Sequence, residues 1–218
     1  MHGLSSSMLL SLRVALVSTV VVAMVGVPLS FLMARRQFRG KSIVDALLIV
    51  PLVLPPTVVG YLILAVMGRH GVIGSILSQL FGYSVLFSWH GAVLASAVVS
   101  LPLLYLPARS AFAGIDREME DLSRLMGSGA LSTFWHVSLP LARRGIASGL
   151  LLAFARGLGE FGATVMVMGD LQNKRTLPIL IYDDYVSGEM RQAAPAVIVL
   201  SAIALLVVFL YNRTTSSR

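Results

Sequence analysis

Residues 14–34 read VALVSTVVVAMVGVPLSFLMA, a stretch without one charged side chain. A helix rises about 1.5 Å per residue, so a stretch of this length reaches across a hydrocarbon core about 30 Å thick. The whole chain has the same character, because 56% of its 218 residues are hydrophobic and only 12% are charged. A soluble domain has roughly 25% charged residues. The sequence therefore predicts a protein built of membrane-spanning helices.

Four further stretches are long and apolar enough to cross a membrane. They cover residues 46–67, 91–108, 146–168 and 193–211. Five crossings would put the two ends of the chain on opposite sides of the membrane. We expect an all-α helical bundle that forms one domain over residues 1–218.

The distribution of Lys and Arg indicates the orientation, since loops rich in these residues stay in the cytoplasm. One side of the expected membrane receives Arg35, Arg36, Arg39, Lys41, Arg109, Arg117, Arg124, Arg143, Arg144, Arg213 and Arg218. The other side receives Arg13, Arg69, Lys174, Arg175 and Arg191. We therefore expect the N-terminus outside and the C-terminus in the cytoplasm. The net charge of +7 then reflects topology rather than nucleic-acid binding.

Two stretches could be mistaken for other features. Residues 71–89 are uncharged but interrupted by Gly, Ser and Gln, and a crossing there would move the Arg-rich central loop outside. We interpret them as an external loop or an interfacial helix. Residues 1–8 lack a basic start, so we expect no cleaved signal peptide.

The sequence offers little for covalent chemistry or metal binding. It has no cysteine, and its histidines lack the spacing of metal ligands; these are His2, His70, His90 and His136. Gly40-Lys41-Ser42 looks like the end of a phosphate-binding loop, but Arg35 stands where that loop requires Gly, and a membrane span precedes it. We expect no cofactor or metal to be bound by this chain.

Two predicted spans contain residues that are unusual in a membrane. Pro51, Pro55 and Pro56 remove backbone donors and exclude a regular helix in the second span. Irregular backbone at membrane depth lies against protein or lines a water-filled cavity, so this string is either part of a solute pathway or a simple kink. Arg156 and Glu160 are four residues apart in the fourth span, within pairing reach on one helix face. They either line or gate a pathway or neutralise each other inside the bundle.

Small residues recur every four positions in the same fourth span and its approach, forming a smooth ridge that suits close helix packing. The ridge consists of Gly145, Gly149, Ala153 and Gly157.

The central loop, residues 109–144, has the pattern of a helix, a turn and a second helix. Acids near its start favour a helix beginning there; they are Asp116, Glu118, Glu120 and Asp121. Gly127 and Gly129 then break or turn that helix. A second short helix is predicted over residues 131–137, ending at Leu139-Pro140. The pattern fits a surface that sits in a partner's groove, or an ordinary amphipathic linker.

The spacing within this loop resembles the cytoplasmic loop of ABC importer permeases. Their consensus reads Glu-Ala-Ala, three residues, Gly, nine residues, Ile, any residue, then Leu-Pro. Here the corresponding residues are Asp121-Leu122-Ser123, Gly127 and Val137-Ser138-Leu139-Pro140. The chain keeps an acid at the first position but lacks the two small residues that follow it.

Further strings resemble the molybdate permease subunits of that family. They are PLVLPPTVVGY at residues 51–61, FSWHGAVL at 87–94 and FARGLGEFGAT at 154–164. The string LPILIY at residues 177–182 also resembles molybdate and tungstate permeases. With the central loop, these strings extend the resemblance over nearly the whole chain.

The resemblance implies the ABC importer permease fold and a subunit that works by alternating access in a cell membrane. Its partners would be membrane lipid, a second copy of itself, two ATPase subunits that bind ATP and Mg, and an external molybdate- or tungstate-binding protein. Residues 109–145 would form the ATPase-coupling loop, through Asp121, Leu122, Ser123, Gly127, Ser128, Gly129, Val137, Leu139 and Pro140. The translocation pathway or gate would include Pro55, Pro56, Thr57, Arg156, Glu160 and Thr164.

Two other functions stay open at this point. The first is a permease of the same superfamily for sulfate, phosphate or another solute. The second is a channel or ion-coupled carrier that works without an ATPase, against which the central loop argues. Residues 169–194 carry mixed charge and could meet the binding protein, although any solvated loop has the same composition.

Overall fold

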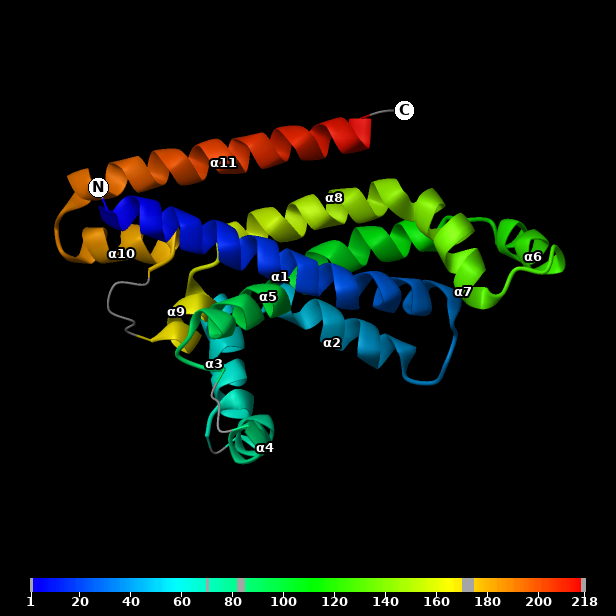
Figure 1. Cartoon of the computed structure of the whole chain (residues 1–218), viewed down its shortest axis with the longest axis horizontal. Helices are drawn as coiled ribbons and strands as arrows, with labels where there is room; N and C mark the ends of the chain where they lie inside the picture. Colours follow the sequence, from blue (N-terminus) through cyan, green and yellow to red (C-terminus); the bar gives the residue numbers. More distant parts are fainter. Residues whose placement is uncertain (1, 70, 82–84, 170–174, 217–218) are drawn as a thin grey trace.

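The computed structural model of the chain describes residues 2–69, 71–81, 85–169 and 175–216. Within these residues every regular element is a helix. Four long helices lie side by side, as Figure 1 shows. They are α1 (His2–Arg35), α5 (Trp89–Ala113), α8 (Leu139–Leu158) and α11 (Met190–Ser216).

Helix α5 is the centre of this bundle. In the most apolar part of α5, 67% of the residues are buried, whereas in the corresponding part of α11 only 17% are buried. Leu104, Tyr105 and Phe112 are fully buried on α5, and α1 and α8 pack against it. The outer helices therefore leave wide apolar faces uncovered, as expected of a bundle whose solvent is lipid.

Five helices of the described residues are long and apolar enough to cross a membrane, which confirms the expected number of spans. Helices α1, α5 and α11 contain the first, third and fifth predicted stretches. The chain begins at one end of the long helices and finishes at the other (Figure 1), as an odd number of crossings requires.

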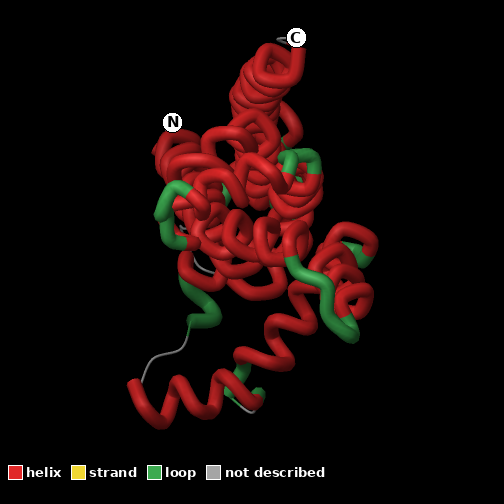
Figure 2. The backbone as a smooth tube through the Cα atoms, turned by 90° about the vertical axis from the view of Figure 1, so that its right-hand side faces the viewer, coloured by secondary structure: helices red, strands yellow, loops and turns green. Residues whose placement is uncertain are grey.

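The second span differs from the prediction for residues 46–67. The chain forms α2 (Lys41–Val53) and α3 (Pro56–Met67), and the backbone is extended at Leu54 and Pro55 between them. The candidate crossing extends over Pro56–Ile76 and so reaches past the end of α3. Two consecutive prolines end α2 because neither can donate the next helical hydrogen bond. Figure 2, seen along the long helices, shows the resulting departure from the bundle.

Helix α4 (Val72–Phe81) lies beyond α3, on the far side of the bundle from α11 (Figures 1 and 2). Its ten residues would reach about 15 Å, half the thickness of the hydrocarbon core. The stretch 71–89 thus contains a helix too short to cross by itself. Residues 82–84 of that stretch lie outside the described residues.

The fourth span, predicted over residues 146–168, is wrong at both ends. A long apolar helix runs over Ala130–Leu158, and α9 (Gly162–Met168) follows after a break. The helix ends early because Gly159 and Glu160 leave helical geometry and the Glu160 side chain binds the first turn of α9. The predicted pair Arg156 and Glu160 therefore spans the end of α8 rather than one continuous helix.

The predicted second short helix does not end at Leu139-Pro140. Helix α7 (Ala130–Thr133) passes through a π-helical turn (Phe134–Ser138) directly into α8. In that turn the Leu139 amide bonds to the Phe134 carbonyl, five residues back. The wider turn accommodates Pro140, which would clash with a carbonyl of a regular helix.

The ridge of small residues on α8 lies against α5, which confirms its role in packing. A methyl group on Gly145 would lie 2.4 Å from Cβ of Ala111, and one on Gly149 would lie 2.9 Å from Leu104. The two helices thus approach as closely as glycine allows. At the other end of the bundle, α10 (Leu177–Val186) is tied to α1, because the Leu177 amide donates to Oγ of Ser11 over 2.7 Å.

Candidate functional site

The central loop begins with a capped helix, α6 (Arg117–Leu125). Asp116 precedes it, and its carboxylate accepts a hydrogen bond from the Glu118 amide over 3.1 Å. Glu118 and Glu120 lie in the first turn, where the positive end of the helix favours them. The prediction that the acidic run starts a helix is confirmed.

The turn after α6 depends on one of the two predicted glycines. Gly127 has a φ of +90°, a left-handed conformation that favours glycine. The Ser128 amide closes the turn by donating to the Ser123 carbonyl. Gly129 lies in the same break, directly before α7, as predicted. Its φ of −69° is open to any residue, so the left-handed turn does not depend on it.

Large apolar side chains project from this turn, from α6 and α7 beside it, and from the π-helical turn that follows α7. We call them the apolar tip: Leu122, Leu125, Met126, Leu131 and Trp135. Leu125 is 84% exposed and Met126 is 88% exposed. Since α6 and α7 lie beyond the end of the long helices (Figure 1), the apolar tip has the character of a docking surface.

The predicted coupling residues fall into two groups. Asp121, Leu122 and residues 127–129 lie at or beside the apolar tip, and Asp121 forms an exposed ion pair of 3.3 Å with Arg124. Ser123 is half-buried, 3.3 Å from the Thr133 hydroxyl of α7. Val137, Leu139 and Pro140 lie instead where the π-helical turn meets α8, and Leu139 packs against the core beside Ala142.

Glu120 was expected only as one of the acids that start α6; its burial and its distant partners were not predicted. It is 4% exposed, although it lies in the most polar helix of the molecule. Its Oε1 accepts from Nη2 of Arg35 at 2.8 Å, from Nε of Arg35 at 3.1 Å and from Oγ of Ser138 at 2.7 Å. Arg35 also donates from both terminal nitrogens to the Ile115 carbonyl at 3.2 Å. We call Arg35, Glu120 and Ser138 the Glu120 cluster.

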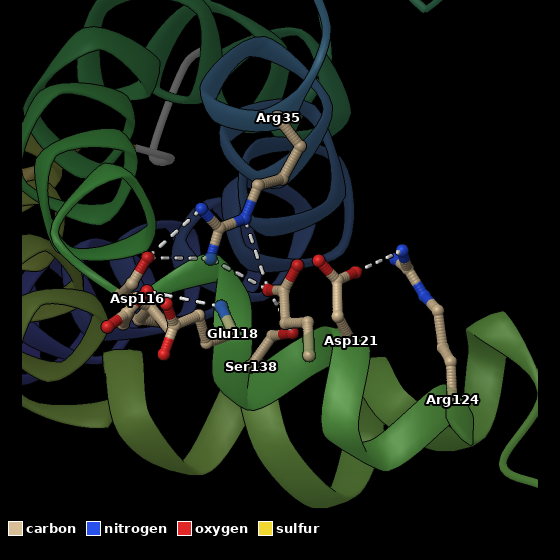
Figure 3. Close-up of polar contacts among 8 residues, drawn as sticks. Arg35, Asp116, Glu118, Asp121, Arg124 and Ser138 are labelled. Atoms are coloured by element: carbon tan, nitrogen blue, oxygen red, sulfur yellow. Dashed lines mark hydrogen bonds and ion pairs between the residues drawn. The ribbon is translucent and has the colours of Figure 1, made fainter.

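Figure 3 shows Arg35 and Ser138 converging near the start of α6, while Asp121 and Arg124 pair at a separate place on the same helix. The cluster joins the last residue of α1, the first turns of α6 and the π-helical turn before α8. No local pattern in the sequence pairs these positions, which are 85 and 18 residues apart. Ser138 stands inside the motif string, but as its variable position.

A second polar cluster ties α2 to α5 at the same end of the bundle. Arg109 lies 3.0 Å from Asp45, and the buried Tyr105 hydroxyl donates to the same carboxylate. Helix α2 has no buried residue, so these polar contacts supply a specific attachment to the bundle. Asp45 lies 60 or more residues from both partners in the chain, so no local sequence pattern predicts these contacts.

The break between α2 and α3 and the break between α8 and α9 lie against each other. Helix α3 packs against α9, and a methyl group on Gly60 would lie 2.8 Å from Cβ of Met166 and 2.9 Å from the Ala163 backbone. A methyl group on Gly162 would lie 3.0 Å from Cβ of Pro56. The structure thus brings together the two strings in which pathway residues were predicted.

The six predicted pathway residues differ in exposure. Pro55 and Thr57 are exposed, Pro56 is half-buried, and Thr164 is buried. Glu160 is 2% exposed, whereas the side chain of Arg156 is 28% exposed. The six predicted pathway residues therefore extend from the protein interior to its exposed surface.

Arg156 and Glu160 form the pair expected from their spacing. Nη1 of Arg156 lies 2.6 Å from Oε2 of Glu160, a close ionic contact rather than an aligned hydrogen bond. Oε1 of Glu160 accepts the Ala163 amide over 2.8 Å. Glu160 thus neutralises Arg156 and also holds the first turn of α9.

Apolar cavities flank both breaks. One of about 300 Å³ lies beside the first break, between Pro51, Leu54, Leu62 and Leu94. Another of about 620 Å³ lies beside the second, between Phe161, Tyr182 and Ile198. Apolar walls bind an ion poorly, so contacts to a charged solute would fall to the polar groups of the breaks. Among the described residues, no three His, Cys, Asp or Glu side chains gather as metal ligands would.

Comparison with known proteins gives the family. Residues 26–215 match the family described as "Binding-protein-dependent transport system inner membrane component". The molybdenum transport system permease protein ModB of Escherichia coli K12 is 44% identical over 177 residues, covering 81% of this chain and 77% of that protein. A putative molybdenum transport system permease, YvgM of Bacillus subtilis, is 39% identical over 201 residues, 92% and 88% of the two chains.

Solved structures share the fold. A subunit of a bacterial ABC transporter involved in alginate import superposes with a TM-score of 0.77 at 16% identity, covering 98% of this chain and 79% of that chain. A subunit of an amino acid ABC transporter superposes with a TM-score of 0.61 at 18% identity, over 96% and 91%. The chain is therefore a multi-pass membrane protein with the fold of ABC transporter permeases, and it belongs to the family of binding-protein-dependent transport system inner membrane components.

Proposed function

We propose that the chain is the membrane subunit of an ATP-driven importer for molybdate or tungstate. The observation that carries the substrate class is the similarity to molybdenum transport permeases over most of both chains. The strings around the two helix breaks resemble such permeases, and the structure brings these strings into contact. Molybdate and tungstate are oxyanions of nearly the same size, shape and charge, so this chain is not expected to distinguish them.

The complex would contain two copies of this chain, two ATPase subunits and an external binding protein. The N-terminus would lie outside and the C-terminus in the cytoplasm, so that the apolar tip meets the ATPase. Exposed apolar side chains such as Leu125 and Met126 suit a groove of that partner. ATP and Mg would be bound there, and this chain would supply motion and a pathway without covalent chemistry.

The roles of individual residues follow from their surroundings. Asp121, Leu122 and residues 127–129 would contact the ATPase, while Val137, Leu139 and Pro140 would pass its motion into α8. Pro55, Thr57 and Arg156 would border the solute pathway, since they are at least partly exposed at the helix breaks. Thr164 and Glu160 would shape that region from within. Residues 169–194 would meet the binding protein; residues 170–174 of this segment lie outside the described residues.

Uptake of labelled molybdate into liposomes tests this proposal. The liposomes contain this chain, its ATPase and its binding protein, and the competitors are tungstate and sulfate. We expect uptake that requires ATP and that tungstate, but not sulfate, blocks. Uptake without the ATPase would replace the importer with a channel or carrier. An assembled complex that hydrolyses ATP and takes up sulfate but not molybdate would overturn the substrate class.

A further inference from the structure

The Glu120 cluster holds three separate parts of the chain at one carboxylate oxygen. Oε1 of Glu120 is within hydrogen-bond distance of two nitrogens of Arg35 and of the Ser138 hydroxyl. Arg35 ends α1, and Ser138 ends the π-helical turn that leads into α8. The start of α6 is therefore fixed to two of the helices that surround α5.

The other half of α6 has weaker ties to the bundle. Asp121 and Arg124 bind only one another in the contacts described, across 3.3 Å on an exposed face. The Ser123 hydroxyl lies 3.3 Å from that of Thr133 in α7, the next helix of the same loop. A push on the apolar tip reaches α8 directly, because α7 continues through the π-helical turn into α8. It reaches α1 through the fixed end of α6, where Glu120 binds Arg35.

The Glu120 cluster is buried, so its charged groups must pair with one another rather than with water. Glu120 is 4% exposed and the side chain of Arg35 is 11% exposed. A buried ion pair adds little net stability compared with apolar packing, yet it specifies which groups must meet. Hydrogen bonds to a charged group are also stronger and more directional than neutral ones.

We propose that Glu120 is a positioning residue that passes motion of the apolar tip to α1 through Arg35 and, through Ser138, makes α1 move together with the start of α8. The inference rests on the proposed coupling of this loop to an ATPase. Without the cluster, the tip would still bind the ATPase and move α8, but α1 would no longer follow that motion. ATP hydrolysis and transport would then separate.

The variant Glu120→Gln keeps the size of the side chain and removes its charge. Glu118→Gln is the matched control, because Glu118 lies in the same helix turn, is exposed and undergoes the same chemical change. Uptake and ATP hydrolysis are measured on the same liposomes. We expect Glu120→Gln to lower the ratio of molybdate taken up to ATP hydrolysed about tenfold, the size of one lost hydrogen bond to a charged group. Glu118→Gln should leave that ratio unchanged.

Proportional losses of uptake and hydrolysis in Glu120→Gln would contradict the proposal, since they would indicate a role in assembly alone. Normal uptake together with normal hydrolysis would contradict it as well. If Glu120→Gln fails to assemble, Ser138→Ala tests the same proposal. It removes the hydroxyl that donates to Glu120 and keeps the ion pair with Arg35. That variant should lower the ratio about tenfold, since it loses one hydrogen bond to a charged group; a normal ratio would overturn the role of the cluster.

A substrate-independent measurement separates failure of this inference from failure of the proposed function. The chain has no cysteine, so spin labels can be placed at Leu32→Cys in α1 and Met119→Cys in α6, both exposed and outside the apolar tip. We expect one narrow distance distribution between the labels, unchanged by Glu118→Gln and broadened by Glu120→Gln. Equal widths in all three would overturn the inference even if transport were confirmed. A broadened distribution would support it even if molybdate were the wrong substrate.

Discussion

The turn at Gly127 and the break before Gly162 both interrupt helices at glycine, but their surroundings are opposite. Nothing lies within 4 Å of where a side chain on Gly127 would begin, whereas one on Gly162 would lie 3.0 Å from Pro56. Glycine is needed at the turn for its left-handed backbone and at the break for the close approach of α3. The turn is therefore open to contact with a partner, whereas the break packs against α3 of the same chain.

The charged residues of the two regions differ in the same way. Asp121 beside the turn pairs with Arg124 in the open, while Glu160 at the break is 2% exposed and holds both Arg156 and the Ala163 amide. Changes at the turn should weaken contact with another subunit, and changes at the break should disturb the fold and the pathway.

The largest effect is expected at the apolar tip. Leu125→Asp places a charge on a side chain that is 84% exposed, so the isolated chain should keep its fold. Burial of that charge in the ATPase groove should weaken binding by about 4 kcal/mol, as for a central interface residue. Copurification of the ATPase measures the loss, with Leu125→Met as the control. Full recovery of the ATPase with Leu125→Asp would remove the tip from the interface.

A smaller loss is expected at the break, where a buried carboxylate would be removed. Glu160→Ala strands Arg156 and leaves the Ala163 amide without its acceptor. We expect a loss of about 3 kcal/mol in the stability of this chain, with the ATPase still bound. Replacement of both charges, Arg156→Gln with Glu160→Gln, should harm thermal stability and uptake less. Equal or greater harm from the double replacement would show that the pair is not what matters.

The contact between the two breaks can be tested without changing a charge. Gly60→Ala adds a methyl group 2.8 Å from Cβ of Met166 and forces α3 from α9. Overpacking of this kind costs about 2 kcal/mol. Gly3→Ala is a suitable control, since nothing lies within 4 Å of its added methyl group. Melting in detergent should show a lower midpoint for Gly60→Ala alone; equal midpoints would mean that the helices part easily.

The smallest effect is expected at the turn itself. Gly127→Ala puts a side chain into a left-handed conformation, at a cost of about 1 kcal/mol. Gly129→Ala should cost less, because its φ of −69° suits any residue. Amide hydrogen exchange over residues 122–133 would reveal faster exchange in the first variant. The same exchange in both would contradict the distinction drawn between the two glycines.

The sequence was sufficient where the information is local. The apolar stretches predicted five spans, the prolines predicted the interruption between α2 and α3, and Asp116 with the following acids predicted the start of α6. Each depends on hydrophobicity, a missing amide or a helix cap within a few residues.

The sequence was insufficient where contacts between residues far apart in the chain determine helix ends and side-chain pairing. Pro140 was expected to end a helix, but the π-helical turn before it lets the helix continue. Residues 146–168 were apolar enough for one span, yet the Glu160 carboxylate turns inward and starts a new helix. The pairing of Glu120 with Arg35, and of Asp45 with Arg109, depends on packing of α1, α2 and α5 that no local pattern encodes.

Sided labelling of Thr57→Cys tests most directly whether ATP at the loop moves the helix breaks. Thr57 is exposed at the first break, and its cysteine would be unique because the natural chain has none. Oriented complexes are treated with a membrane-impermeant maleimide from one side, with and without ATP held on the ATPase. We predict that ATP changes the side from which Thr57→Cys reacts. Reaction from the same side and at the same rate in both states would contradict alternating access at this site.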